Sequence, residues 1–97
     1  MGMTPQRSEK SIELAVVKFA KERGWLVRKM NGPGYRGWPD REFLKDGKTF
    51  FIEFKAPGKK LDPLQTQMFI ILRRANFSCH IVDDAAGGKA IILAEDI

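Results

Sequence analysis

The sequence DREFLKDGKTFFIEFK, residues 40–55, predicts two β-strands joined by a tight turn. Asp46-Gly47 in its middle favours a two-residue type I′ turn, because both central residues of that turn need a positive φ. The strands are expected at residues 40–45 and 48–55. The second strand is nearly all apolar over residues 49–52, which is typical of a central strand buried between two layers. The stretch therefore predicts a hairpin at the centre of a sheet.

The register of this hairpin brings charged residues together. A two-residue turn pairs Lys45 with Lys48, and the pairing that follows puts Asp40 directly opposite Glu53, with Cβ atoms about 4.5–5.5 Å apart. Lys55 projects from the same face as Glu53, because it lies two residues further along the strand. Two carboxylates in register repel each other, and a divalent cation, a shared proton or a shifted register would relieve the repulsion. These charged residues form the candidate site.

An amphipathic helix is predicted over residues 8–23, with a serine cap at its start and Gly24 at its end. Residues 25–30 favour a strand, and Asn31-Gly32-Pro33-Gly34 is a loop by composition. The apolar stripe of the helix is predicted to consist of Ile12, Val16, Phe19 and Ala20.

A second helix is expected from residue 62 or 63 to residue 75, because aspartate is a good N-cap and the proline after it suits the first helical position. Residues 77–82 and 90–93 are expected to be short strands joined across Gly87-Gly88. The order helix, three strands, helix, two strands predicts an α/β or α+β domain with one mixed sheet flanked by helices. The buried face of the second helix is predicted to be Leu64, Met68, Ile71 and Leu72.

Length and composition limit the class of protein. The 97 residues predict one domain, residues 1–97, and 43% hydrophobic with 30% charged residues is ordinary for a globular chain. Residues 1–7 are expected to be a disordered or tag-derived N-terminus without a signal peptide. No apolar run approaches the roughly 20 residues of a membrane span, so no membrane is expected. The single cysteine, Cys79, cannot form an internal disulfide, which fits a reducing compartment.

The residues available as ligands limit the kind of metal site. One cysteine and one histidine, His80, cannot supply the nitrogen and sulfur ligands of a usual zinc site. A metal would have to be held mainly by oxygen, which predicts Mg²⁺ or Mn²⁺. The net charge of +5 favours an anionic partner, nucleic acid first, although a basic protein without such a partner is an equally ordinary interpretation.

Three motifs follow one another along the chain: GWPD at residues 37–40, FIEFK at 51–55 and LDPLQ at 61–65. In this order they resemble the VRR-NUC branch of the PD-(D/E)XK nuclease superfamily, whose core is a Pro-Asp pair, a Glu-x-Lys triplet and a glutamine that opens the next helix. The resemblance covers roughly Glu9 to Asp84 and implies a restriction-endonuclease-like α/β core. Trp38 departs from the family, which more often has a small aliphatic residue there. Its indole could be a core group or a stacking surface for a base.

The resemblance implies a metal-dependent site that hydrolyses phosphodiester bonds in DNA. Asp40 and Glu53 would bind the metal, helped by the backbone carbonyl of Phe54. Lys55 would orient the attacking water and offset charge on the phosphate, and Gln65 would complete the catalytic set. For Lys55, an electrostatic and positioning role is favoured over that of a literal general base.

Such families also place a glutamate from the first helix near the metal. The resemblance favours Glu13, counted back from Gly24. Glu9 is the alternative, because it lies one helical turn earlier on the same face. For both residues, and for Glu9 above all, a solvated helix charge is the plain competing interpretation.

The resemblance also bears on partners and setting. Residues 68–72 are apolar nearly all round, which together with the family predicts a homodimer that acts on branched DNA such as four-way junctions. A phage or prophage protein in the cytoplasm of a bacterial host or phage-infected cell would fit. The main alternative is a non-catalytic nucleic-acid-binding domain with the same fold. A third interpretation, an enzyme that acts on a small phosphorylated metabolite, has no support because the sequence contains no phosphate-loop motif. Five cations beside the predicted site are candidate contacts to the DNA backbone: Arg28, Lys29, Arg36, Lys59 and Lys60.

Overall fold

The computed structural model describes residues 8–97, so the interpretation of residues 1–7 lies outside the described part of the chain. Within the described part, no helix is both long enough and apolar enough to cross a membrane. The elements follow in the order α1 (Glu9–Glu22), β1 (Leu26–Lys29), β2 (Arg41–Lys45), β3 (Lys48–Phe54), α2 (Pro63–Arg74), β4 (Ser78–Val82) and α3 (Ala85–Glu95).

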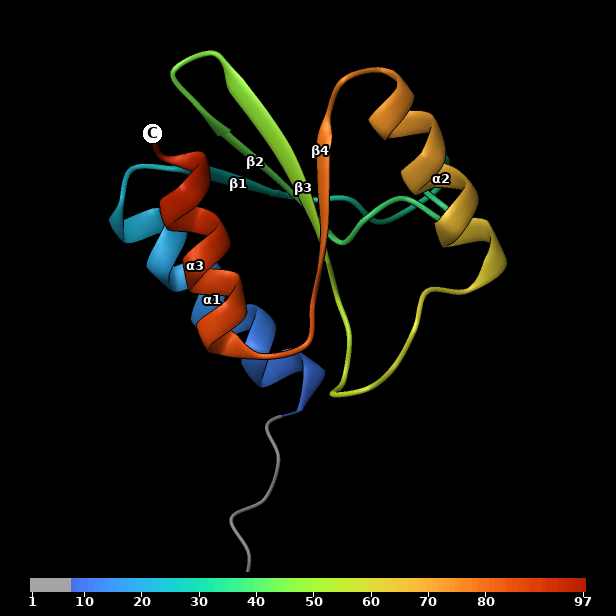
Figure 1. The fold of residues 1–97 in the computed structure, drawn as a ribbon, viewed down its shortest axis with the longest axis horizontal. Coiled ribbons are helices and arrows are strands. Elements are labelled where there is room, and N and C mark those ends of the chain that lie inside the picture. The colour runs from blue at the N-terminus through green and yellow to red at the C-terminus, as the bar shows by residue number, and fades with distance from the viewer. Residues whose placement is uncertain (1–7) are drawn as a thin grey trace, which may run out of the picture.

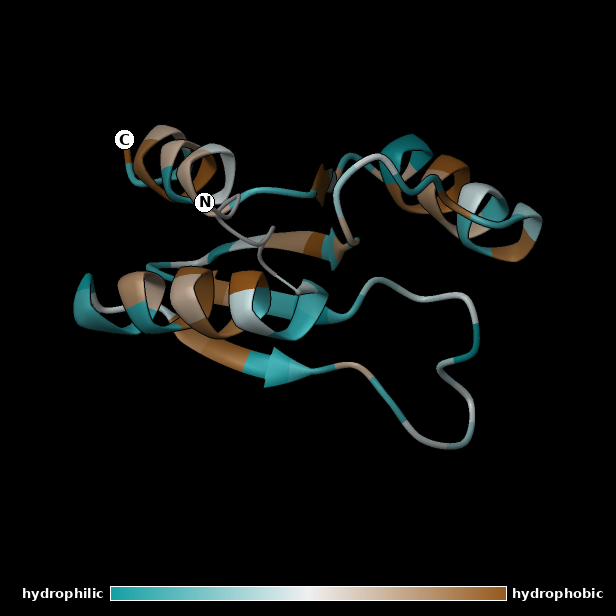
Figure 2. Cartoon of the chain, turned by 90° about the horizontal axis from the view of Figure 1, so that it is seen from below, coloured by the Kyte–Doolittle hydropathy of each residue, from teal (hydrophilic) through white to brown (hydrophobic). Residues whose placement is uncertain are grey.

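The four strands form one mixed sheet in the order β1-β2-β3-β4. β1 and β2 are antiparallel, as are β2 and β3, whereas β3 and β4 run parallel. Helices α1 and α3 lie together on one side of the sheet, and α2 lies apart from them, near β4 (Figure 1). In Figure 2 the apolar brown appears on both the strands and the helices, while the connecting segments are largely white or teal. The predicted α/β domain with a mixed sheet flanked by helices is confirmed.

The central hairpin has the predicted turn and register. Asp46 and Gly47 have φ values of 50° and 78°, the positive angles that a type I′ turn needs. Lys45 pairs with Lys48, and the ladder continues in the predicted register as far as the pair of Arg41 with Ile52. Both strands stop one residue short of the prediction at the site end, so Asp40 immediately precedes β2 and Lys55 immediately follows β3.

The core consists of two clusters on opposite faces of the sheet, and β3 contributes to both because its side chains alternate between them. On one face, Phe50, Ile52 and Phe54 pack with residues of α1 and with Ile92 of α3. On the other face, Phe51 packs with the buried residues of α2 and β4. The second cluster consists of Met30, Phe51, Phe69, Leu72 and Cys79.

The second cluster also explains two side chains of uncertain role in the sequence. Trp38 is half-buried and packs on Phe51, with ring centroids 6.1 Å apart, so its indole belongs to the core more than to an open stacking surface. Cys79 is buried, and burial raises the pKa of its thiol to about 11.

The predicted last strand, residues 90–93, is wrong, because these residues belong to α3. The backbone N–H of Gly87 donates to the side chain of Asp84, which caps the helix. Gly88 is buried, and a Cβ atom at this position would overlap the side chain of Val16 on α1. The two glycines therefore open a helix that packs closely against α1, instead of forming a turn between two strands.

The predicted buried face of α2 is only partly right. Leu72 is buried and Met68 is half-buried, but Leu64 and Ile71 are 41% and 50% exposed. Phe69, absent from the predicted face, is 2% exposed. The helix touches the sheet mainly along β4, so only a narrow stripe of its apolar surface is covered.

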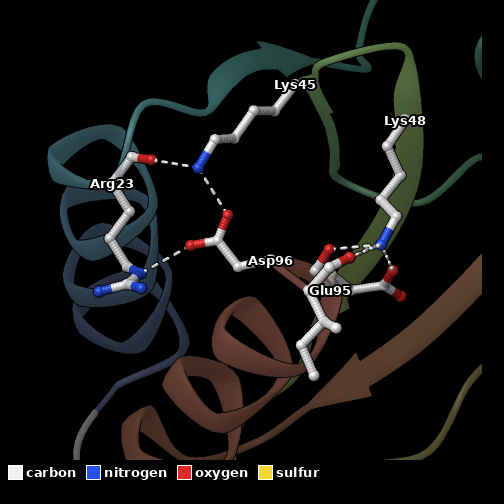
Figure 3. Close-up of polar contacts among 6 residues, drawn as sticks. Arg23, Lys45, Lys48, Glu95 and Asp96 are labelled. Carbon is white, nitrogen blue, oxygen red and sulfur yellow. Dashed lines mark hydrogen bonds and ion pairs between the residues drawn. The ribbon is translucent and has the colours of Figure 1, made fainter.

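Ion pairs fasten the turn end of the hairpin to the last turn of α3 (Figure 3). Asp96 accepts from Arg23 Nε at 2.9 Å and from Lys45 Nζ at 2.6 Å. Lys48 Nζ donates to the backbone carbonyl of Glu95 at 2.6 Å. Lys45 directly precedes the turn and Lys48 directly follows it, so this cluster lies at the opposite end of β3 from Glu53.

Candidate active site

The predicted site residues meet at the end of the sheet where β3 finishes. Asp40 immediately precedes β2, and its Oδ2 accepts a hydrogen bond from the backbone N–H of Phe54 at 2.8 Å. Lys55 follows β3, and its backbone N–H donates to Val82 on β4 at 2.9 Å. These two hydrogen bonds place Asp40 and Lys55 at the end of β3 that carries Glu53, although the paired residues of the ladder end at Arg41 and Ile52, one pair before the predicted pairing of Asp40 with Glu53.

Glu53 is the most constrained group in the site. Its side chain lies on the α2 side of the sheet, and the residue is 3% exposed. Its Oε2 accepts from Gln65 Nε2 at 3.1 Å and lies 3.5 Å from Lys55 Nζ. Its Oε1 is buried and has no hydrogen-bond partner within residues 8–97. Burial first and the neighbouring charge of Asp40 second raise the pKa of Glu53 to about 7, against the opposing effect of Lys55.

The pKa of Asp40, like that of Glu53, is raised. Burial is the largest cause that raises the pKa of its carboxyl above the ordinary value, and the hydrogen bond from Phe54 opposes it. The charges of Glu13 and Glu9 raise the pKa of Asp40 further, whereas Lys55 lowers it. Two neighbouring carboxyl groups with raised pKa values form a pair that an added positive charge would stabilise.

The donor set fits a hard divalent cation. Oε1 of Glu53 is a buried acceptor without a partner among residues 8–97, and burying it costs free energy unless a donor or a positive charge meets it. Oxygen ligands of this kind are those of Mg²⁺ and Mn²⁺. Among residues 8–97, no group of three or more His, Cys, Asp and Glu side chains is arranged to hold a metal ion. The available ligands are therefore two carboxylates, Asp40 and Glu53, with backbone oxygens.

Glu13, the predicted metal ligand from α1, forms an ion pair with Arg41. It is 8% exposed, and its Oε2 accepts from Arg41 Nε at 2.6 Å. Arg41 follows Asp40 directly, and its side chain lies on the opposite, α1 side of the sheet, because neighbouring residues of a strand alternate. The role of Glu13 as a metal ligand thus stays a prediction. Glu9 is exposed in the first turn of α1, and its charge raises the pKa values of both Asp40 and Glu53.

Two residues near the site were missed by the sequence reasoning. Arg41 could have been found from the strand alternation, since a charge directed at a buried helix face needs an acidic partner there. Asp62 was predicted only as a helix cap. It forms a capping box with Gln65, and the Asp-x-x-Gln spacing was the signal for that link.

The candidate DNA-binding cations lie in the two loops at the site end of the sheet or next to them. Arg28 forms an ion pair with Glu42 at 2.7 Å, so part of its charge is already neutralised. Lys29, Arg36, Lys59 and Lys60 are exposed and make no ion pair within the described residues 8–97. The segment that joins β1 to β2 and carries Arg36 extends away from the sheet at the lower right of Figure 2.

The fold and the site together define a nuclease-type α/β domain. No family model matches the sequence. A solved structure described as a VRR_NUC domain is similar to the chain, with a TM-score of 0.70 and 30% sequence identity. The match covers 90% of this chain and 97% of that structure. The chain therefore belongs to the VRR-NUC domain family, as its three motifs indicate.

A phage protein is similar as well. The sequence is 45% identical over 58 residues to the protein named "Putative nuclease p44" of Acyrthosiphon pisum secondary endosymbiont phage 1. The match covers 59% of this chain and 62% of the phage protein. The chain thus spans a little under two thirds of this relative.

Proposed function

We propose that the protein is a metal-dependent DNA endonuclease that hydrolyses phosphodiester bonds, with Asp40, Glu53 and Lys55 at its catalytic centre. The observation that carries the proposal is Oε1 of Glu53, which lies buried beside Asp40 and has no hydrogen-bond partner in the part of the chain that the structure describes. Membership of the VRR-NUC family and the similarity to a phage protein named as a nuclease support the same chemistry.

The residues of the site have distinct tasks in this proposal. Asp40 and Glu53, with the backbone carbonyl of Phe54, would hold Mg²⁺ or Mn²⁺. The cation would supply Lewis acidity toward a phosphoryl oxygen and the attacking water. Lys55, with a side chain only 16% exposed, places a positive charge where negative charge develops in the transition state. Gln65 donates to Glu53 and so limits its rotation.

From α1, Glu13 remains the proposed additional ligand, and Glu9 is the alternative. Glu13 would have to leave Arg41 in order to reach a cation. Glu13→Gln and Glu9→Gln variants separate the two, with Mn²⁺ affinity as the measurement. A weaker affinity in only one of them identifies the residue that contributes.

DNA is the proposed substrate, and branched DNA such as a four-way junction is the proposed structure. Lys29, Arg36, Lys59 and Lys60 are exposed cations in or next to the loops beside the site, so they can contact phosphates on either side of a bound strand. The phage relative and the single cysteine support action in the cytoplasm of a bacterial host or phage-infected cell.

A homodimer is the proposed assembly, because two active sites suit paired cuts in a junction. Exposed apolar side chains on and next to α2 support it: Leu64, Ile70, Ile71, Phe77 and Ile81 are 41–50% exposed. Sedimentation equilibrium at micromolar concentration is expected to give a dimer, and Ile71→Glu is expected to give a monomer. A wild-type monomer would contradict the proposed assembly.

The decisive experiment compares cleavage of labelled four-way junction, 5′-flap and linear duplex DNA in Mg²⁺, Mn²⁺ or EDTA. We expect cutting only with a metal ion, and no cutting by Asp40→Ala. Asp46→Asn is the matched control, because it removes one carboxylate at the turn end of the hairpin. Paired symmetric cuts in the junction would support the branched-DNA substrate. DNA binding without cutting in any metal would instead favour a non-catalytic binding domain.

A further inference from the structure

The start of α2 is joined to the site through Gln65, which takes part in three hydrogen bonds. The side chain of Asp62 accepts from the backbone N–H of Gln65 at 2.9 Å. The backbone N–H of Asp62 donates to Gln65 Oε1 at 3.0 Å, which completes a capping box. Gln65 Nε2 then donates to Glu53 Oε2 at 3.1 Å. The same glutamine amide therefore belongs both to the helix cap and to the site.

The two ends of this amide are not interchangeable. Its oxygen can only accept a hydrogen bond, and its nitrogen can only donate. A flipped amide would direct its NH₂ group at the N–H of Asp62 and its oxygen at the carboxylate of Glu53. Both contacts would become repulsive, so the cap and the carboxylate impose the same orientation on Gln65.

This orientation decides which oxygen of Glu53 is available. Oε2 faces two donors, Gln65 Nε2 and Lys55 Nζ. Oε1 is left buried and without a partner within residues 8–97. We propose that Asp62 is a positioning residue of the active site, which acts through the amide of Gln65 to present Glu53 Oε1 to the cation. The inference rests on the proposed metal-dependent function.

Metal affinity tests this role without relying on catalysis. Titration calorimetry with Mn²⁺ is expected to show about tenfold weaker binding for Asp62→Ala, the size typical of outer residues that orient a ligand. Asp62→Asn keeps a side-chain acceptor at the cap and is expected to bind Mn²⁺ nearly as well as wild type. Failure of Asp62→Asn to restore the affinity would assign the effect to lost charge and overturn the proposal.

Asp84→Ala is the matched control, because it removes the same charge and the N-cap of α3. Like Asp62→Ala, it is expected to lower stability through the loss of a helix cap, but it is expected to leave Mn²⁺ affinity unchanged. Circular dichroism checks that both variants are folded. An equal loss of Mn²⁺ affinity in Asp84→Ala would mean that general destabilisation, rather than positioning, weakens the site.

A double-mutant cycle tests whether Asp62 acts through Gln65. Gln65→Met removes the amide at similar length, and adding Asp62→Ala to it should then weaken Mn²⁺ binding little further. Additive losses would overturn the proposed route. Unchanged Mn²⁺ affinity in Asp62→Ala would overturn the positioning role while the nuclease proposal stands. A wild-type chain that binds no Mn²⁺ would remove the proposed function and this inference together.

Discussion

Glu53 holds a carboxyl group in a place that disfavours its charge. The residue is 3% exposed, and only one of its two oxygens has hydrogen-bond or ion-pair partners within residues 8–97. Burial raises its pKa to about 7 from the ordinary 4.5. The folded chain without metal therefore binds this proton more tightly than the unfolded chain does.

This shift predicts how stability depends on pH without metal. Because the folded pKa is raised, the stabilising contribution is fully present below the unfolded pKa of 4.5 and is lost as the pH rises through about 7. The loss should be on the order of 3 kcal/mol, since one pKa unit corresponds to about 1.4 kcal/mol. Urea unfolding in EDTA at pH 5 and pH 8 measures it, with Glu53→Gln as reference.

Glu53→Gln cannot ionise, so its stability should change less between these pH values than that of the wild type. At pH 8 it should be the more stable of the two. A wild-type chain that loses no more stability than Glu53→Gln would contradict the raised pKa. Mn²⁺ should reduce the pH dependence of the wild type, because a bound cation favours the ionised carboxylate.

Lys55 offers a second test at the residue scale. Lys55→Ala should lower the single-turnover rate of DNA cleavage by about 10²–10³-fold, the usual cost of removing one group that stabilises transition-state charge. DNA affinity in Ca²⁺ should change little, because the side chain is only 16% exposed and contributes little to the open surface. Near-normal cleavage by Lys55→Ala would refute its assignment to the catalytic centre.

Among the elements, α1 and α3 form a layer whose spacing depends on Gly88. A Cβ atom there would overlap Val16 Cγ2 and come within 3.0 Å of Val82 Cγ1. Both neighbours are β-branched and buried, so neither can move aside by changing a rotamer freely. The close contact of α1 with α3 thus requires a residue without a side chain.

Gly88→Ala should lower the free energy of unfolding by about 1–3 kcal/mol, the range for overpacking a core. The better helix propensity of alanine offsets about 1 kcal/mol of a larger steric cost. Chemical denaturation measures the change. In a Val16→Ala background the same substitution should cost less, because the overlapping methyl groups are gone. Equal costs in both backgrounds would rule out the contact with Val16 as the cause.

The elements also differ in how well the sequence predicts them. The turn and register of the hairpin were predictable to the residue, because Asp46-Gly47 determines the turn and the turn determines the register, whereas each strand stops one residue short of its prediction at the site end. Residues 90–93 were not, since Gly87-Gly88 looks the same in a turn as in a close helix contact. Only the position of Val16 distinguishes the two, and that contact is set by tertiary packing.

The site residues also differ in whether local sequence or tertiary packing determines where they lie. Asp40, Glu53 and Lys55 follow from the register and the motifs. The pairing of Glu13 with Arg41 depends on how α1 packs across the sheet, which no local pattern encodes.

On the scale of the whole molecule, positive charge has to be judged by where it lies. Lys59 and Lys60 are exposed in the loop after β3, beside the site. Lys21 is also exposed, but it lies in the last turn of α1, toward the turn end of the hairpin. The net charge of +5 does not distinguish these positions.

DNA binding should distinguish them. Each lost phosphate contact lowers the slope of log affinity against log salt by about 1. The double variant Lys59→Ala, Lys60→Ala should therefore bind junction DNA more weakly and with a shallower salt dependence. Lys21→Ala should match the wild-type slope in the same fluorescence anisotropy titration. Identical slopes for all three proteins would locate the DNA path elsewhere.

The burial of Cys79 has a practical consequence. Its thiol lies in the core, and its pKa of about 11 keeps it protonated at neutral pH. Maleimide reagents attack the thiolate, so they should leave it unmodified. Lys21→Cys would then give a chain with one reactive thiol, on the outside of α1. A dye attached there could report on single molecules as they meet DNA, with the native cysteine left in place.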